Sequence, residues 1–194
     1  INNRGYPDLT RALGITAPSL YRHFADKDQL LDAVCAKYYR QLGQAMRDAT
    51  RGLPTALERL HALGMAYVRF AVQTPLMYRV ATDTAPRQPS EFDETPVNSA
   101  FVHLQHTVQE LIDEAFFPPT DSLGPALQLW AAAHGVASLL VTRPYLPWGD
   151  TEAFASSVLR SVCLGQAVAG LDLTTLLPRS GGGQNPTTHP TQEN

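Results

Sequence analysis

The sequence predicts an all-α protein, and three observations support this fold class. Apolar residues recur at helical spacing along most of the 194 residues, whereas the alternating pattern of strands is almost absent. Apolar residues make up 44% of the chain and charged residues 17%, so a folded core is expected. Glycine and proline divide the periodic stretches into segments of helix length. We therefore expect a small helical N-terminal domain followed by a larger helical bundle.

A short helix, a tight turn and a second short helix are expected at the start of the chain. Pro7 can begin the first helix, and Gly14 can end it. Thr16 can cap the second helix, over about residues 17–24, and Pro18 falls in its first turn, where the missing N–H costs little. Helix, turn and helix is the layout of a motif that reads DNA, although a tight corner in a helical bundle gives the same pattern.

A long helix is expected next, over about residues 26–50. Asp26 and Gln29 have the spacing of a capping box, with Asp in the place of Ser or Thr. Gly52 and Pro54 then break the chain, and we expect a domain boundary there. The apolar stripe expected on the long helix consists of Leu31, Val34, Tyr38, Leu42, Ala45 and Ala49.

Further helices are expected after this break. Residues 122–142 contain no charged residue and approach the length of a membrane span. They also contain Gln128 and His134, so we expect a helix buried in a core or a subunit interface, and no membrane association. The helices expected after the break cover about residues 54–73, 76–82, 95–117, 122–143 and 150–170.

Charge is divided unevenly along the chain, whose formal net charge is −3. Residues 1–47 contain seven basic and four acidic residues, whereas residues 48–194 contain eight and fourteen. A basic N-terminal part on an acidic body suits a protein that contacts phosphate at that end alone. The side chains expected to contact DNA are Thr16, Ala17, Pro18, Ser19, Tyr21, Arg22, His23 and Lys27.

No feature of the sequence indicates an enzyme, a cofactor or a metal site. No glycine-rich phosphate loop follows a strand, and no nucleophile or carboxylate pair stands out. Cys35 and Cys163 lie in apolar contexts, so we expect free buried thiols in a reducing, cytoplasmic compartment. His103, His106 and Glu110 share a helix face, but other polar residues share it too, so we expect a solvated surface rather than a metal site.

Two stretches of the chain resemble the TetR/AcrR family of bacterial transcriptional regulators. The sequence GITAPSLYRHFADKDQLL, at residues 14–31, resembles the helix-turn-helix end of that family's DNA-binding domain. Trp130, His134 and Gly135 resemble the Trp-His-Gly signature of one C-terminal subclass. The resemblance implies a homodimer joined by its last two long helices, operator DNA as a partner, and an effector pocket in each helical body. The family pattern is matched at Gly14, Ile15, Thr16, Leu20, Tyr21, His23, Phe24, Lys27, Leu30 and Leu31.

The expected body contains large, soft side chains with few polar groups, which suit an apolar or aromatic effector. Each of these side chains could instead be an ordinary core residue. The candidates for the effector pocket are Tyr67, Phe70, Met77, Tyr78, Phe101, Leu104, Val108, Trp130 and His134.

These observations together predict three parts of the chain. Residues 1–50 form a helix-turn-helix DNA-binding domain, residues 54–178 form an effector-binding and dimerisation domain, and residues 179–194 form a flexible tail. The expected function is a ligand-responsive repressor that a small apolar or aromatic effector releases from its operator.

The start of the chain departs from the family pattern. Most of the family's first helix is missing before Ile1, and the connection between Tyr6 and Pro7 is short. We expect the complete protein to contain further residues at both places. The alternative function, which this departure raises, is a helical dimer that binds small molecules and has lost DNA binding.

Overall fold

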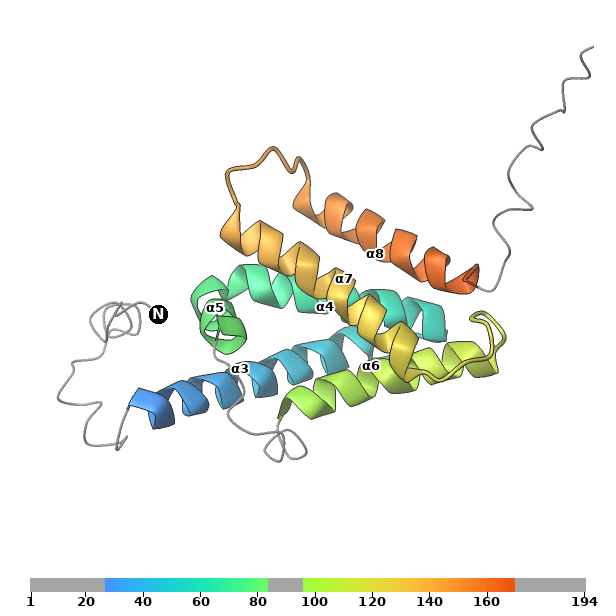
Figure 1. Ribbon diagram of the computed structural model, residues 1–194, viewed down its shortest axis with the longest axis horizontal. Coiled ribbons are helices and arrows are strands. Elements are labelled where there is room, and N and C mark those ends of the chain that lie inside the picture. Colours follow the sequence, from blue (N-terminus) through green and yellow to red (C-terminus); the bar gives the residue numbers. More distant parts are fainter. Residues whose placement is uncertain (1–26, 84–95, 170–194) are drawn as a thin grey trace, which may run out of the picture.

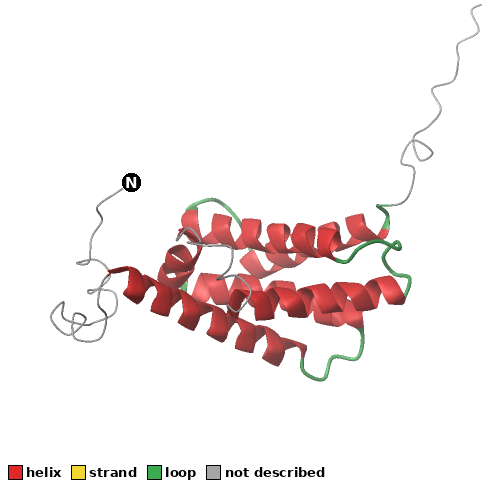
Figure 2. Cartoon of the chain, turned by 60° about the horizontal axis from the view of Figure 1, so that its bottom comes forward, coloured by secondary structure: helices red, strands yellow, loops and turns green. Residues whose placement is uncertain are grey.

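All elements of the described chain are helices, joined by loops and turns (Figure 1, Figure 2). The computed structural model describes residues 27–83 and 96–169, and the helices expected over residues 7–13 and 17–24 lie outside this range. The described residues contain no strand, as the sequence predicts. The helices are α3 (Lys27–Thr50), α4 (Ala56–Gln73), α5 (Pro75–Asp83), α6 (Pro96–Asp113), α7 (Leu123–Thr142) and α8 (Thr151–Ala167).

Helix α4 lies at the centre of the bundle. It contacts α3, α6, α7 and α8, and the short helix α5 packs against α3 at one end (Figure 1). Helices α7 and α8 lie side by side and run in opposite directions (Figure 1). Because α4 has neighbours on several sides, a space left between these neighbours is bordered by several helices.

The first turn of α4 is fixed by a capping box. The Thr55 side chain accepts a hydrogen bond from the Glu58 backbone N–H, and the Glu58 carboxylate accepts one from the Thr55 N–H. Both residues thereby satisfy N–H groups that have no partner within the helix. Pro54 was expected to begin this helix; it lies just before the cap instead, since Gly52, with φ +78°, turns the chain there.

Helix α3 contributes its C-terminal half to the core. Tyr38 and Leu42 are fully buried, as the expected stripe requires, whereas Ala45 is only partly buried. Met46, which was not assigned to the stripe, is buried in its place. The buried positions follow a spacing of four residues, which keeps one side of the helix against α4.

Helix α6 ends at Asp113, so the end expected near Phe117 is wrong. The backbone N–H groups of Phe116 and Phe117 both bond to the Leu111 carbonyl, and Ala115 adopts a φ of +56°. This turn stops the helix and directs Phe117 into the core, where it is 1% exposed.

Within one chain, only one side of helix α7 is buried against the core. Leu129, Ala133 and Val136 pack into the core, whereas Leu127 and Leu139 are 44% and 45% exposed. The core of one chain therefore does not bury this helix all round. Among the described residues, α7 alone has the length and composition of a membrane span, a test that core helices of soluble proteins also pass.

Candidate ligand-binding site

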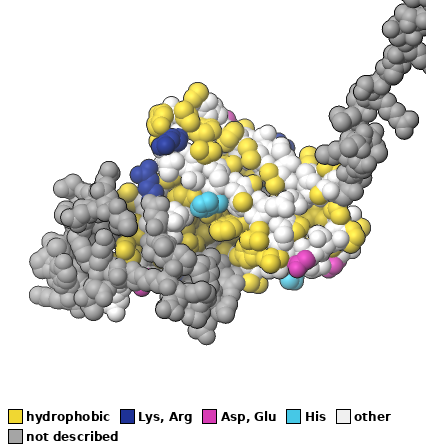
Figure 3. All heavy atoms as spheres, in the orientation of Figure 1, with side chains coloured by type: hydrophobic (Ala, Val, Ile, Leu, Met, Phe, Trp, Pro, Cys, Tyr) yellow, Lys and Arg dark blue, Asp and Glu magenta, His cyan; other side chains and the backbone are white. Residues whose placement is uncertain are grey.

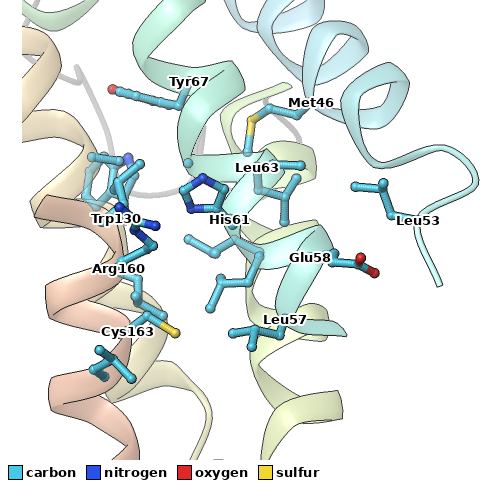
Figure 4. Close-up of a pocket in the computed structure, with 18 of the residues that line it drawn as sticks. Met46, Leu53, Leu57, Glu58, His61, Leu63, Tyr67, Trp130, Arg160 and Cys163 are labelled. Carbon is cyan, nitrogen blue, oxygen red and sulfur yellow. The ribbon is translucent and has the colours of Figure 1, made fainter. Parts of the chain in front are cut away.

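A cavity of about 560 Å³ lies between α4, α7 and α8, with α3 and α6 at its edges (Figure 4). This volume falls in the range of small-molecule pockets, roughly 300–1,000 Å³, and the walls are almost entirely apolar. The cavity is lined by Met46, Leu53, Leu57, Glu58, Leu60, His61, Ala62, Leu63, Gly64, Tyr67, Leu104, Phe116, Leu129, Trp130, Ala133, Leu159, Arg160, Cys163 and Leu164.

The wall formed by α4 follows directly from helical geometry. Leu57, His61, Gly64 and Tyr67 are three or four residues apart, so they lie along one side of the helix. At Gly64 the Leu159 side chain of α8 lies against the α4 backbone, and a Cβ atom at this position would lie 2.9 Å from Cδ1 of Leu159. Leu159 thus packs directly against α4 at this position.

Besides tyrosine, tryptophan and cysteine, three polar side chains line the cavity, namely Glu58, His61 and Arg160. Glu58 is engaged in the capping box, and its Oε2 accepts a hydrogen bond from the Thr55 hydroxyl at 2.8 Å. The His61 ring points into the cavity, and its Nε2 lies 3.4 Å from the Ser156 hydroxyl (Figure 4). Arg160 of α8 lies across from His61 (Figure 4).

The pKa of His61 is held below its ordinary value. Burial is the largest cause, and the positive charges of Arg160 and Arg69 act in the same direction. Arg69 itself forms a two-pronged ion pair with Glu152, with N–O distances of 2.9 and 2.6 Å. In the free protein at neutral pH, His61 is therefore uncharged and Arg160 is the cation at this wall.

A network of hydrogen bonds closes the upper end of the cavity. The Tyr67 hydroxyl lies 2.9 Å from Nδ1 of His134, and the Tyr78 hydroxyl lies 3.3 Å from the same atom. Burial lowers the pKa of His134 and raises that of Tyr67. The histidine is thus neutral, and its unprotonated Nδ1 can accept the Tyr67 hydrogen bond.

The structure brings part of the expected pocket together at the cavity. Tyr67, Leu104 and Trp130 line it. His134 and Tyr78 lie behind Tyr67 in the hydrogen-bond network and do not reach the wall. The other four candidates pack against or within the core away from the cavity, namely Phe70, Met77, Phe101 and Val108.

Several residues of the cavity were not among the candidates. Leu57, His61 and Gly64 share the helical spacing of Tyr67, and this signal alone could have identified them. Arg160 and Cys163 carried no comparable signal, because their position depends on how α8 packs against α4.

The residues expected to contact DNA lie outside the described side chains. Lys27 begins α3, but its side chain is not described. The other seven are Thr16, Ala17, Pro18, Ser19, Tyr21, Arg22 and His23.

The histidines of α6 have partners of their own. Nε2 of His103 lies 3.4 Å from the Thr50 hydroxyl, and Nδ1 of His106 lies 3.3 Å from the Glu110 carboxylate. Glu110 also forms an ion pair with Arg59 at 2.5 Å. These contacts tie α6 to α3 and α4.

Comparison with protein families defines the class to which the chain belongs. The family model described as "Tetracyclin repressor-like, C-terminal domain" matches residues 60–162, just over half of the chain. The model described as "Bacterial regulatory proteins, tetR family" matches residues 3–34. An all-α body behind such an N-terminal domain defines a DNA-binding transcriptional regulator rather than an enzyme. The chain belongs to the TetR family.

Solved structures share this fold. A protein of unknown function from Rhodococcus sp. RHA1 is 24% identical, with a TM-score of 0.67 over 82% of this chain and 83% of that one. The TetR family transcriptional regulator PfmR from Thermus thermophilus is 17% identical, with a TM-score of 0.64 over 81% and 86%. No curated protein matches the sequence. The C-terminal match is to a tetracyclin repressor-like domain, and the Trp-His-Gly subclass stays a prediction.

Proposed function

We propose that this regulator is a repressor that a small, largely apolar effector releases from its operator. The cavity of about 560 Å³ in the helical body is the observation that supports this proposal. Its size and apolar walls suit a small organic molecule. We assign DNA binding to residues 1–50, and effector binding and dimerisation to residues 54–178.

We assign operator recognition to the helix-turn-helix and the start of α3. Tyr21 and Arg22 have long side chains with polar ends that can contact DNA. Lys27 lies at the N-terminus of α3, and helix N-termini bind phosphate. A regulator that works on DNA in this way acts in the cytoplasm. The complete set of proposed DNA contacts is Thr16, Ala17, Pro18, Ser19, Tyr21, Arg22, His23 and Lys27.

The dimer interface is assigned to α7 and α8. Leu127 and Leu139 on α7 are exposed in the single chain, and so are Leu164 on α8 and Val168 at its C-cap. Figure 3 shows apolar side chains spread over the face around α7. An exposed apolar surface of this kind is typical of a protein interface, and two-fold pairing of the helices would bury it.

Helix α3 is the proposed connection between effector and DNA. It begins at the helix-turn-helix, and its Met46 lines the cavity. The Tyr39 hydroxyl also donates a hydrogen bond to the Ala81 carbonyl at the end of α5. An effector that moves α3 need contribute only about 1–3 kcal/mol of coupling to change operator affinity five- to 150-fold.

A mobility-shift experiment with the complete protein and the DNA flanking its own gene tests operator binding. We expect a complex with a dissociation constant of roughly 10⁻⁸–10⁻¹¹ M that weakens steeply with salt. The double variant Tyr21→Ala/Arg22→Ala should abolish it. The matched control Tyr145→Ala/Arg51→Ala changes exposed residues of the body and should leave it intact. A complex that survives the first variant unchanged would refute the assignment.

A thermal-shift screen followed by release from DNA tests the effector. Compounds that raise the melting temperature by binding the cavity should also lower operator affinity. Leu57→Trp places a larger side chain at the cavity wall, where Leu57 is 40% exposed, and should weaken both effects together. Binding without any change in operator affinity would contradict the proposed repressor mechanism.

A further inference from the structure

Arg160 is an exposed side chain of α8 at the edge of the apolar cavity, and it has no acidic partner among the described residues. Within the described part of the chain, no ion pair to its guanidinium is formed. The residues one turn away on α8 are Ser156, Ser157, Cys163 and Leu164, none of which is acidic. The charge is therefore available to a molecule in the cavity.

The acidic residue of the cavity does not compensate Arg160. Glu58 lies on the other side of the cavity in Figure 4, with its carboxylate turned away from Arg160. That carboxylate accepts hydrogen bonds from the Thr55 N–H at 3.1 Å and the Thr55 hydroxyl at 2.8 Å. Because these hydrogen bonds hold the Glu58 carboxylate in the cap of α4, it does not neutralise the positive charge of Arg160.

His61 adds a second donor beside Arg160. Its ring projects from α4 toward the Arg160 side chain (Figure 4), and burial together with that positive charge lowers its pKa. An anion placed between the two side chains would favour the protonated ring. Arg69, the other cation near His61, is already paired with Glu152. The anion would thus meet Arg160 and His61 alone.

The remaining wall suits an apolar body attached to that anion. Leu57, Leu60 and Leu129 are aliphatic, and Tyr67 and Trp130 close the upper end. We propose that the effector is an amphiphile with one acidic head group, such as a medium-chain carboxylate, whose head group binds Arg160 and His61. This inference rests on the proposed function, because it names the class of molecule that the effector cavity accepts.

Displacement of the neutral fluorescent probe N-phenyl-1-naphthylamine from the complete protein tests the inference. Dodecanoate and dodecan-1-ol share an apolar chain and differ in the charge of the head group, and both are used below their micellar concentrations. Charge-assisted hydrogen bonds should make dodecanoate displace the probe about tenfold better than the alcohol. Arg160→Gln should remove this preference and leave the affinity for the alcohol unchanged.

Two variants control the interpretation. Arg143→Gln changes an exposed arginine at the end of α7 that does not line the cavity, and it should retain the tenfold preference. Arg160→Lys keeps the charge and should retain most of it. Circular dichroism verifies that each variant folds. A preference that persists in Arg160→Gln overturns the assigned head-group site.

The displacement experiment distinguishes a failure of this inference from a failure of the proposed function. If the probe binds and the acid and the alcohol displace it equally, the inference is wrong while the effector cavity stands. If the probe does not bind at all, both the inference and the cavity's role in effector binding are overturned. A preference for the acid that depends on Arg160 supports both.

Discussion

At the scale of single residues, His134 is held by two tyrosine side chains. Its Nδ1 is within hydrogen-bond distance of two tyrosine hydroxyls, those of Tyr67 and Tyr78. A neutral ring accepts such a bond, whereas a protonated ring cannot. Tyr38, which stacks edge-on against Tyr78, is completely buried, and its hydroxyl has no hydrogen-bond partner among the described residues.

The lowered pKa of His134 predicts a dependence of stability on pH. The unfolded chain takes up a proton near the ordinary value of 6.5, and the folded protein does so only at lower pH. The free energy of unfolding should therefore fall as the pH drops below about 6.5. His134→Asn keeps an acceptor and should flatten this fall between pH 7 and pH 5, as measured by urea unfolding. His61 and His103 shift in the same direction, so part of the fall should remain.

The exposed His106 provides the control for this experiment. Its side chain is 72% exposed, so His106→Asn should leave the acid-induced loss of stability in place. An equal loss in His134→Asn and in the unchanged protein would show that the buried histidine does not contribute.

At the scale of elements, some helix ends are determined by neighbouring residues in the sequence, whereas others are determined by packing in the core. The Asp150 carboxylate caps α8 by accepting hydrogen bonds from the Glu152 and Ala153 N–H groups. The end of α6 was misplaced, because the turn at Ala115 depends on burying Phe117. A cap needs only neighbouring residues, whereas that turn needs the core.

Removal of the α4 cap should have a measurable effect on stability. Thr55→Ala removes the side-chain oxygen that accepts from the Glu58 N–H, at a cost of about 1 kcal/mol. The melting temperature should fall by roughly 2–4 °C for a protein of this size. Ser161→Ala, on an exposed position of α8, serves as the control. A change below about 0.3 kcal/mol in Thr55→Ala would contradict the role of the cap.

At the scale of the whole molecule, the exposed apolar face of α7 matters most for assembly. Leu127 and Leu139 would be buried together if two copies pair through α7 and α8. Two half-sites one helical turn of DNA apart, about 34–36 Å, require such a pair of reading heads. Dimerisation and operator binding should therefore be lost together.

The double variant Leu127→Glu/Leu139→Glu tests this interface. Buried glutamates facing each other across the two-fold axis would be unpaired, so the dimer should dissociate into monomers in sedimentation experiments. Operator affinity should fall by at least tenfold. Val102→Glu alters an equally exposed apolar residue on α6 and should leave the dimer intact. A variant that remains dimeric would place the interface elsewhere.

The sequence alone predicted the all-α class, the order of the helices and the resemblance to the TetR family. Those properties depend on apolar periodicity, caps and short motifs, which neighbouring residues specify. The tertiary structure alone decided which side chains of α8 join those of α4 at the cavity. His61 and Ser156 are 95 positions apart, and Arg160 lies across from His61 because α8 packs against α4. Such contacts depend on the packing of whole helices, and no local pattern in the chain specifies that packing.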